Sequence, residues 1–302
     1  MLGSDMSIDF IGDEYTSFDI SKLTTIRVGG KVSTFVKPKS LSDLRLLIKK
    51  KNKIKAILGK GSNTLPSDED VDGVIIGMSD FNKSNLLQVK NNIFTVSSGI
   101  SAPKFSKFVA NYGYSGAEFM TAIPGTIGGL LSMNAGCYGT EIWEIVKSVK
   151  TIDFAGNLHT RTADDYNISY RSVIPKHKNE IFLSADLVLI KSSVEKVKDI
   201  IRCLMLKRIS TQPLEKFSFG STFKNTKKIS AAQLIESCNL KGFKIGGAQV
   251  SLKHANFVIN ADGNASSKEI NDLIEHITTK VFNKTGIKLE REVRNLGDGF
   301  EF

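Results

Sequence analysis

The segment from Ile123 to Gly139 constrains the fold of this chain most, because it is apolar yet repeatedly interrupted by glycine. Burial in a hydrophobic core alone does not call for so many glycines. Glycine lacks a Cβ atom, so it lets the backbone approach another backbone or a ligand closely. One interpretation is therefore a tightly packed turn. The other is a slot in which backbone N–H groups bind a flat or phosphorylated cofactor.

A second glycine segment, residues 59–63, follows the apolar run Ile54–Leu58, which predicts a buried strand. Consecutive N–H groups of such a loop can face one concavity, which suits a phosphate or pyrophosphate. Ile54 stands where a P-loop requires its first glycine, and Thr64 stands where a dinucleotide-binding fingerprint requires its last glycine or alanine. An ordinary glycine turn is the alternative for this loop alone. Two such segments in one chain favour a nucleotide-type cofactor more strongly than either does alone.

The composition bounds the class of protein. The chain has 302 residues, of which 41% are hydrophobic, so it can bury a sizeable core and is not disordered throughout. At roughly 100–200 residues per domain, this length predicts two or three domains. No stretch approaches the roughly 18 apolar residues of a membrane helix, and the first residues do not resemble a secretory signal. Cys137, Cys203 and Cys238 are odd in number and far apart, which argues against a disulfide framework. We expect a soluble, cytoplasmic protein.

The charge of the chain predicts anionic ligands. Lys and Arg total 41 against 31 Asp and Glu, a formal net charge of +10. Such an excess attracts nucleic acid or phosphorylated small molecules. The lysines are scattered, however, with a run only at 49–51, and no aromatic-interleaved RNA-binding motif or zinc finger accompanies them. We therefore expect no nucleic-acid partner, and a basic nucleic-acid-binding protein remains the alternative from a different class.

Hydrophobic periodicity and capping residues predict the helices. The stripe Val194, Val197, Ile201, Leu204 and Met205 indicates one of them. In the last helix, Ser266 and Glu269 form a capping box, Gly286 ends the helix, and the expected buried face is Ile270, Leu273, Ile274, Ile277, Val281 and Phe282. The predicted helices are 41–52, Pro103 to Gly113, 193–209, 230–241 and 266–285.

Short strands alternate with these helices. A hairpin is expected to turn at Asn91-Asn92, because asparagine tolerates positive φ, and another turn is expected at 155–157. The predicted strands are 54–58, 74–76, the two arms of 86–98, 181–190 (central in its sheet), 249–250, 257–259 and 287–296. The alternation of 287–296 places Ile287, Leu289 and Val293 on one face. We predict an α+β protein with domains at residues 1–75, 76–205 and 206–302.

A few polar residues outside the glycine segments could carry chemistry. Ser221 follows Gly220 in a loop, and Arg171 follows Tyr170 in a polar stretch. Arginine in such a place can clamp a carboxylate or stabilise developing negative charge, although most such arginines are surface residues. Glu292 reads equally well as a charge on the wet face of an edge strand. Among the four histidines, none lies at metal-ligand spacing or near a Gly-x-Ser-x-Gly motif, so we expect neither a metal site nor a serine hydrolase.

Taken together, these segments resemble one family, the bacterial UDP-N-acetylenolpyruvoylglucosamine reductases (MurB), and the shorter type II branch in particular. The resemblance runs from about residue 20 to 297. The segments occur in the order of the family, which makes the match specific although each motif is modest. They are Thr24–Gly30, Gly59–Thr64, Ile123–Gly139, Tyr170-Arg171, Gly220–Asn225, Gly246–Val250 with His254–Phe257, and Leu289–Arg294. One departure is Thr226, which stands where the family usually has proline.

The resemblance implies a three-domain flavoenzyme. Its first two domains would hold FAD in the manner of the vanillyl-alcohol-oxidase-like (PCMH-type) fold, and its third domain would bind substrate. NADPH would reduce the FAD, and another FAD-dependent oxidoreductase on this fold is the rival within the enzyme class. The implied FAD-binding residues are Gly59, Lys60, Gly61, Ser62, Asn63, Thr64, Gly125, Thr126, Gly128, Gly129, Ala135, Gly136 and Arg294.

The resemblance also implies the catalytic roles. Hydride would add to the methylene carbon of the enolpyruvyl group of a UDP-sugar, which yields UDP-N-acetylmuramate, a peptidoglycan precursor. Arg171 and a protonated Glu292 would stabilise the resulting enolate, and Ser221 would protonate the α-carbon. The implied substrate-binding residues are Tyr170, Lys224, Asn225 and Gln249. No obligate protein partner and no membrane insertion are expected.

Overall fold

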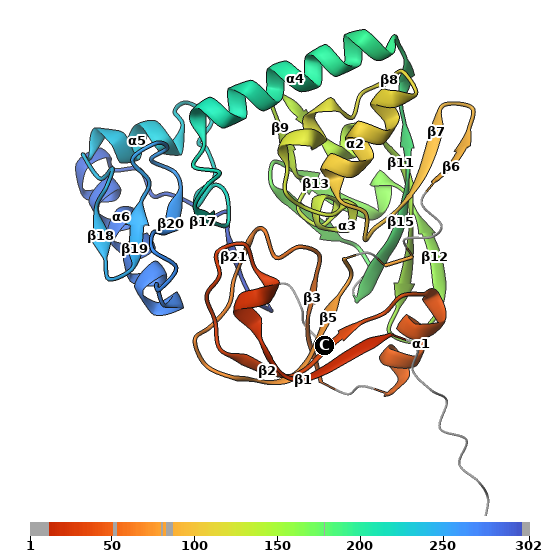
Figure 1. Cartoon of the computed structure of the whole chain (residues 1–302), viewed down its shortest axis with the longest axis horizontal. Coiled ribbons are helices and arrows are strands. Elements are labelled where there is room, and N and C mark those ends of the chain that lie inside the picture. The colour runs from red at the N-terminus through yellow and green to blue at the C-terminus, as the bar shows by residue number, and fades with distance from the viewer. Residues whose placement is uncertain (1–11, 51–52, 80, 83–86, 178, 298–302) are drawn as a thin grey trace, which may run out of the picture.

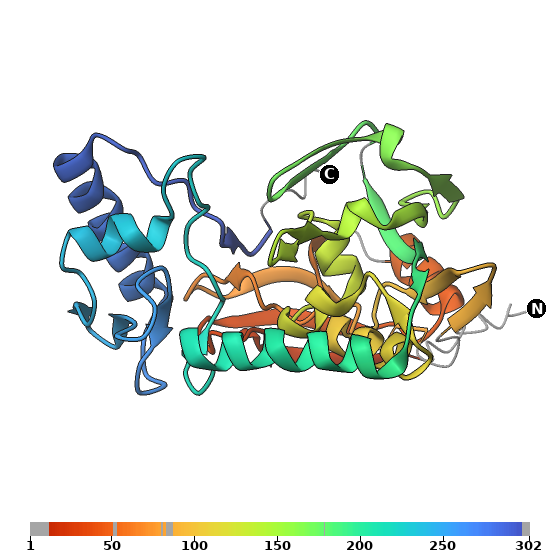
Figure 2. The same ribbon diagram turned by 90° about the horizontal axis from the view of Figure 1, so that it is seen from above.

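The chain folds into three parts that meet in the middle of the molecule. The computed structural model describes residues 12–50, 53–79, 81–82, 87–177 and 179–297. In Figure 1 the N-terminal part (red and orange) lies below, the middle part (yellow and green) lies at the upper right, and the C-terminal part (blue) lies at the left. Helix α4 (Val194–Thr211) extends from the middle part toward the C-terminal part, as Figure 2 also shows from above.

The N-terminal part is a four-stranded sheet with one helix on it. The strand order is β1 (Asp13–Asp19), β2 (Lys31–Lys37), β5 (Val71–Gly77) and β3 (Ile54–Leu58), with only β1 antiparallel to its neighbour. Helix α1 (Leu41–Lys50) packs Leu44, Leu47 and Ile48 on one face of this sheet, and the short helix η1 (Ile20–Leu23) lies at the other face. The helix expected at 41–52 is confirmed over 41–50, and residues 51–52 lie outside the described residues.

The middle part is built on a five-stranded antiparallel sheet. Its order is β12 (Leu158–Arg161), β11 (Val146–Asp153), β15 (Glu180–Val188), β7 (Ile93–Ser97) and β6 (Leu87–Lys90). The predictions of a central strand after residue 180 and of a hairpin at Asn91-Asn92 are confirmed. These asparagines have φ of 50° and 62°. Helices α2 (Ala102–Asn111) and α3 (Ile127–Leu131) pack on the sheet. The shorter elements are β8 (Tyr114–Ser115), η2 (Glu118–Ala122), β9 (Gly136–Cys137), β10 (Thr140–Glu141), η3 (Ile142–Glu144), η4 (Ala163–Asp165), β13 (Tyr166–Ser169), β14 (Ser172–Pro175) and β16 (Ile190–Lys191).

Helix α4 lies on the surface of the molecule. Its predicted stripe faces the protein, but only Val197 is fully buried, and Leu206 and Ile209 are exposed. The boundary that we proposed at residue 206 falls inside α4, and the boundary at residue 75 falls inside β5. The domain boundaries at residues 75 and 206 remain proposals from sequence. None of the helices in the described part of the chain combines the length and hydropathy needed to span a membrane.

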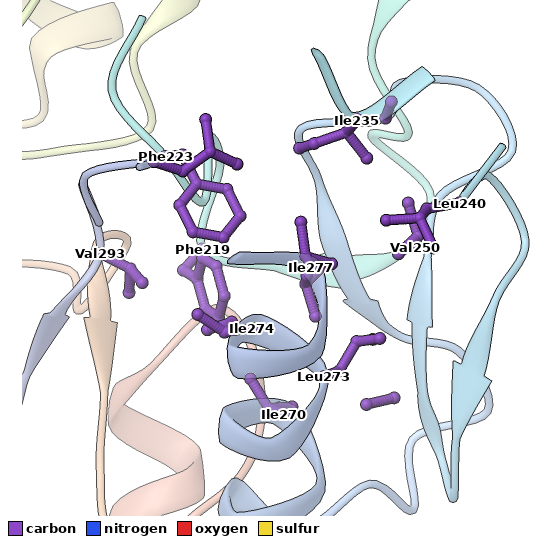
Figure 3. Close-up of a cluster of buried hydrophobic side chains, with 14 of the residues drawn as sticks. Phe219, Phe223, Ile235, Leu240, Val250, Ile270, Leu273, Ile274, Ile277 and Val293 are labelled. Carbon is purple, nitrogen blue, oxygen red and sulfur yellow. The ribbon is translucent and has the colours of Figure 1, made fainter. Parts of the chain in front are cut away.

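The C-terminal part packs two helices on a small sheet. The strand order is β17 (Phe217–Ser218), β20 (Val258–Asn260), β19 (Ala248–Val250) and β18 (Lys244–Ile245). Helices α5 (Ala231–Ser237) and α6 (Ser267–Thr285) complete it, and Figure 3 shows α6 and the sheet enclosing the hydrophobic core. The capping box of α6 and its end at Gly286, with φ of 69°, are confirmed.

Three predictions for this part are wrong in detail. Helix α5 ends before 241, because Asn239 adopts a φ of 56°, which a helix cannot contain. Phe282 is 51% exposed and does not belong to the buried face of α6. The strand expected at 287–296 is confined to β21 (Arg294–Asn295), which pairs with β4 (Thr64–Leu65). Residues before it lie along the Ser221 loop instead, through a single bridge between Phe223 and Arg291.

The C-terminal part is fastened to the N-terminal part at the start of α6. Asp68 accepts hydrogen bonds from the backbone N–H groups of Ser267 and Lys268, at 2.7 and 2.8 Å. A carboxylate at this position accepts hydrogen bonds from N–H groups that have no partner within the helix, and its negative charge interacts favourably with the positive end of the helix dipole. Nearby, the Asn260 side chain donates to the carbonyl of Ile26 at 3.2 Å. These contacts hold the two parts in one orientation.

We expect Asp68→Ala to lower the free energy of unfolding by about 1 kcal/mol, the usual cost of losing a helix cap. Urea unfolding followed by circular dichroism measures this change. Glu69→Ala is the matched control, because it removes the same charge from the adjacent residue without touching α6. Equal unfolding midpoints for the two variants would contradict the assigned role of Asp68.

Candidate active site

Arg171 projects from a tight turn in the middle part. Tyr170 and Arg171 form the two-residue connection between β13 and β14, whose last paired residues are Ser169 and Ser172. Arg171 has a φ of 54°, a left-handed conformation that a large side chain rarely adopts. Such a conformation persists only where surrounding contacts enforce it, and it is frequent at functional sites.

The guanidinium group of Arg171 is held on several sides. Its Nε donates to Glu292 Oε1 at 2.9 Å, and its Nη2 and Nη1 donate to the carbonyls of Gly136 and Asn134 at 2.6 and 3.4 Å. The two side chains of the ion pair are only 16% and 11% exposed. The cation is therefore fixed in a nearly dry environment, where its interaction with another charge is stronger than in water.

Glu292 is largely buried, with a side chain 11% exposed, whereas the wet face of an edge strand would have left it at the surface. Burial raises the pKa of its carboxyl group above the ordinary glutamate value, and Arg171 and Lys224 oppose this effect less strongly. The raised pKa favours the protonated form, which can donate a hydrogen bond. Its backbone N–H donates to the carbonyl of Thr222 at 2.9 Å, which places Glu292 beside the Ser221 loop.

Ser221 lies between two buried phenylalanines of the C-terminal core. Phe219 and Phe223 point into this core (Figure 3), whereas Gly220 turns the chain with a φ of 82° and Ser221 stays half-buried. A Cβ atom on Gly220 would meet nothing within 4 Å, so there is open space next to Ser221. Within the described part of the chain, the Ser221 hydroxyl makes no hydrogen bond, which leaves it available to a substrate.

The first glycine loop approaches the same place. The Asn63 side chain donates to the carbonyl of Glu292 at 3.1 Å, and the N–H of Arg294 donates to the carbonyl of Asn63 at 3.1 Å. Arg294 pairs with Thr64 in the short ladder of β21 and β4. The loop, the Glu292 segment and Arg171 are thus brought together from the three parts of the chain.

The two glycine segments pack against each other. A Cβ on Gly59 would lie 2.3 Å from Thr126 Oγ1, a distance that only glycine permits. Thr126 caps α3 by accepting from the N–H of Gly129, and a Cβ on Gly125 would lie 3.8 Å from Ser62 Oγ. The Lys60 ammonium donates to Ser101 Oγ at 3.2 Å across the same junction. Packing therefore explains part of the glycine content.

The remaining features of this junction fit a phosphorylated cofactor. Among the described residues, the backbone N–H groups of 60–63 donate to no other protein group, so consecutive donors are available. Within the described ranges, the hydroxyls of Thr24, Thr25 and Ser98 are buried there and form no hydrogen bond. Unsatisfied buried hydroxyls are costly and rare, so they indicate a polar ligand.

The other residues predicted for the cofactor and substrate have mixed surroundings. Lys224 forms an ion pair with Glu290 and lies near Glu292. Asn225 accepts from the N–H of Ala231 at 3.0 Å at the start of α5, and Gln249 donates to the carbonyl of Gly242 at 3.1 Å within the C-terminal part. The structure does not bring Gln249 into contact with the Arg171–Glu292 pair. Among the remaining residues, Tyr170 is 44% exposed and Ala135 is buried. The N–H of Gly128 donates to the carbonyl of Ser98, and the carbonyl of Gly136 accepts from Arg171.

Sequence reasoning placed Asn134 only in the cofactor-lining stretch 134–136 and missed that this residue organises the Arg171 turn. It is buried, has a φ of 48°, and donates to Glu141 Oε2 and to the carbonyl of Ser169, the residue before the turn. Asparagine among glycines in an apolar segment was a usable signal, because it tolerates left-handed φ and can bond to the backbone. No group of three or more potential metal ligands occurs in the ranges that the structure describes.

Comparisons with known proteins agree with this geometry. The model of the FAD binding domain family matches residues 32–161, which include both glycine segments. Together with the backbone donors of the loop, this match defines the chain as an FAD-binding flavoprotein. The model of the UDP-N-acetylenolpyruvoylglucosamine reductase C-terminal domain matches residues 212–296, which include Ser221 and Glu292. The chain belongs to the UDP-N-acetylenolpyruvoylglucosamine reductase (MurB) family.

Whole-length similarity carries that conclusion. A reductase of this name from Legionella pneumophila (strain Corby) is 40% identical over 281 residues, which cover 92% of this chain and 91% of that protein. One from Orientia tsutsugamushi (strain Ikeda) is 40% identical over 97% of both chains. The crystal structure of the MurB enzyme from Thermus caldophilus matches with a TM-score of 0.79 and 26% identity, covering 94% of this chain and 98% of that one. The expected α+β class and flavoenzyme fold are thereby confirmed.

Proposed function

We propose that Arg171, Glu292 and Ser221 are the catalytic residues of this enzyme. Its reaction, established by family, is the FAD-dependent, NADPH-using reduction of UDP-N-acetylglucosamine enolpyruvate to UDP-N-acetylmuramate, a step of peptidoglycan precursor synthesis. The observation that carries the proposal is the largely buried Arg171–Glu292 contact of 2.9 Å. Backbone hydrogen bonds connect it to the Ser221 loop, and Asn63 connects it to the glycine loop.

The charge that develops in this reaction determines the role of the first two residues. When bound, FAD supplies the hydride, which originates from NADPH, for the methylene carbon of the enolpyruvyl group. Negative charge then builds on the α-carbon and its carboxylate. The Arg171 guanidinium is preorganised to stabilise that charge, because its orientation is already fixed before substrate binds. Burial raises the pKa of Glu292, and in its protonated form this carboxyl group would donate a hydrogen bond to the same carboxylate.

Ser221 supplies the proton that completes the reduction. Its O–H bond breaks as a C–H bond forms at the α-carbon, and the serine oxygen then regains a proton from solvent. The open space beside Gly220 gives the substrate access to this hydroxyl. Because Ser221 and Glu292 are adjacent through the Thr222 carbonyl, the proton donor and the enolate-stabilising group act on one substrate group.

The anionic ligands explain the positive charge of the chain. We propose that the N–H groups of 59–63 hold the pyrophosphate of FAD, that residues of 125–129 and 134–136 line the remainder, and that Arg294 lies near the flavin. Lys224 and the side-chain NH₂ of Asn225 hold the UDP-sugar, with Tyr170 at the rim. No nucleic acid and no obligate protein partner are required. A cytoplasmic location agrees with the free thiols of Cys137, Cys203 and Cys238.

Glu292→Gln tests the proposed protonation state. In this proposal the active form of Glu292 carries a proton. The wild type should therefore reduce substrate at its maximal rate below the raised pKa of Glu292, and the rate should fall as the pH rises through that pKa. Glutamine cannot titrate, so we expect the rate of this variant to be independent of pH in this range. Because an amide is a weaker hydrogen-bond donor than a carboxylic acid, we also expect the rate to be about 10- to 100-fold lower. Stopped-flow measurements across pH with pre-reduced enzyme give the result.

Glu290→Gln serves as the matched control, because Glu290 is two residues away and its side chain is 71% exposed. This control should retain the pH-dependent fall. Unaltered turnover of Glu292→Gln at every pH would remove Glu292 from the catalytic residues.

A further inference from the structure

Asn256 is a buried asparagine whose side chain binds the Ser221 loop. It is 3% exposed and lies just before β20. Its Oδ1 accepts from the N–H of Phe223 at 2.9 Å, and its Nδ2 donates to the carbonyl of Phe223 at 2.8 Å. One carboxamide thus satisfies both backbone groups of a single residue, as a neighbouring strand would. Its own carbonyl accepts from the N–H of Thr222 at 2.9 Å.

Asn256 is itself firmly anchored. Its N–H donates to His254 Nδ1 at 3.2 Å, and burial lowers the pKa of that imidazole, which keeps the ring neutral and able to accept. Ser251 Oγ accepts from the N–H groups of Lys253 and His254 and holds the start of the same turn. On the far side of Phe223, the phenyl ring fills the hydrophobic core (Figure 3).

The Thr222–Phe223 backbone therefore lies between two partners. Asn256 binds this backbone on one side, and the Glu292 segment binds it on the other. The Glu292 N–H donates to the carbonyl of Thr222, and the Lys224 N–H donates to the carbonyl of Glu290 at 2.8 Å. Ser221 is covalently attached to the residue at which these contacts meet. Any shift of Phe223 toward or away from Asn256 moves the Ser221 hydroxyl relative to Glu292.

We propose that Asn256 is a positioning residue for Ser221, setting where its hydroxyl lies relative to Glu292 and Arg171. The inference rests on the proposed role of Ser221 as proton donor. Asn256 contacts neither the glycine segments nor Arg171, so it should affect reduction of the substrate and leave reduction of FAD by NADPH unaffected. A displacement of about 1 Å can slow a positioned reaction about 100-fold.

Asn256→Asp is the variant of choice, because it keeps the size of the side chain and the acceptor for Phe223 but replaces the donor with an oxygen that repels the Phe223 carbonyl. By anaerobic stopped flow, we expect FAD reduction by NADPH within about 2-fold of wild type and substrate reduction about 10- to 100-fold slower. A larger solvent deuterium isotope effect on the second step should accompany the loss. If this variant does not accumulate as a folded flavoprotein, Asn256→Ser removes both side-chain bonds without adding charge.

Ser251→Ala is the matched control, since it loosens the same turn without touching Phe223. It should leave both half-reactions near their wild-type rates. The double variant with Ser221→Ala separates the possible failures. If Asn256 acts through Ser221, Asn256→Asp adds little to the effect of Ser221→Ala. If Ser221→Ala slows substrate reduction but Asn256→Asp does not, the positioning role is wrong. If Ser221→Ala has no effect, the proposed function of Ser221 fails first.

Discussion

Replacing Ser221 by alanine is expected to slow substrate reduction by about 10²- to 10⁴-fold, the usual contribution of a positioned general acid. Reduction of FAD by NADPH should proceed at nearly the wild-type rate, because that half-reaction needs no proton on the α-carbon. The removed hydroxyl is half-buried and has no partner among the described residues, so the fold should not be perturbed. Separate stopped-flow measurements of the two half-reactions give both rates.

Ser218→Ala is the control for this variant, because Ser218 is a half-buried serine three residues earlier in β17. We expect it to behave as wild type in both half-reactions. Equal losses in both half-reactions of Ser221→Ala would contradict a role in proton delivery and would indicate damage to the flavin site.

Arg171→Ala is expected to slow substrate reduction by about 10²- to 10³-fold, the effect of removing one preorganised group that stabilises a developing negative charge. The variant also leaves Glu292 buried without its cation, so the pKa of that carboxyl should rise further. Arg171→Lys should recover only part of the rate, because an ammonium cannot reproduce the three directions in which the guanidinium donates. Single-turnover rates at saturating substrate distinguish the two variants.

A comparable arginine in the same part of the chain provides the control. Arg161 forms a largely buried ion pair with Glu180, comparable in exposure to the Arg171–Glu292 pair, and it lies on β12, away from the glycine segments. Arg161→Ala should lower the temperature of unfolding while substrate reduction by the folded protein stays unchanged. If Arg161→Ala and Arg171→Ala slowed substrate reduction equally, the effect of Arg171 would be one of stability alone.

Local features of the fold could be predicted from sequence because each depends on a few adjacent residues. The capping box at Ser266, the left-handed Gly286 and the Asn91-Asn92 turn are of this kind. The strand expected at 287–296 failed because its partners are distant in sequence. Glu292 bonds to Thr222 and Asn63, and these contacts, unlike periodicity, decide its conformation and burial.

In the candidate site too, the residues could be predicted from sequence, whereas the contacts between distant segments could not. The resemblance identified Arg171, Ser221 and Glu292, but not that Arg171 and Glu292 touch each other, since they are 121 residues apart. Thr226, a departure from the family, proves to close its own turn, by donating to the carbonyl of Ile229 at 2.7 Å and accepting from the N–H of that residue. The buried asparagines 134 and 256 do not react themselves. The sequence signals a special backbone at Asn134 at most, and the hydrogen bonds of both residues reveal which segments they hold in place.

The most direct test is anaerobic absorption spectroscopy of the freshly purified protein. We expect a flavin spectrum that NADPH bleaches and that UDP-N-acetylglucosamine enolpyruvate then restores, with UDP-N-acetylmuramate formed in an amount equal to the FAD reoxidised. A colourless protein that binds no FAD, or a reduced flavin that only oxygen reoxidises, would contradict the assignment of this chain as the reductase.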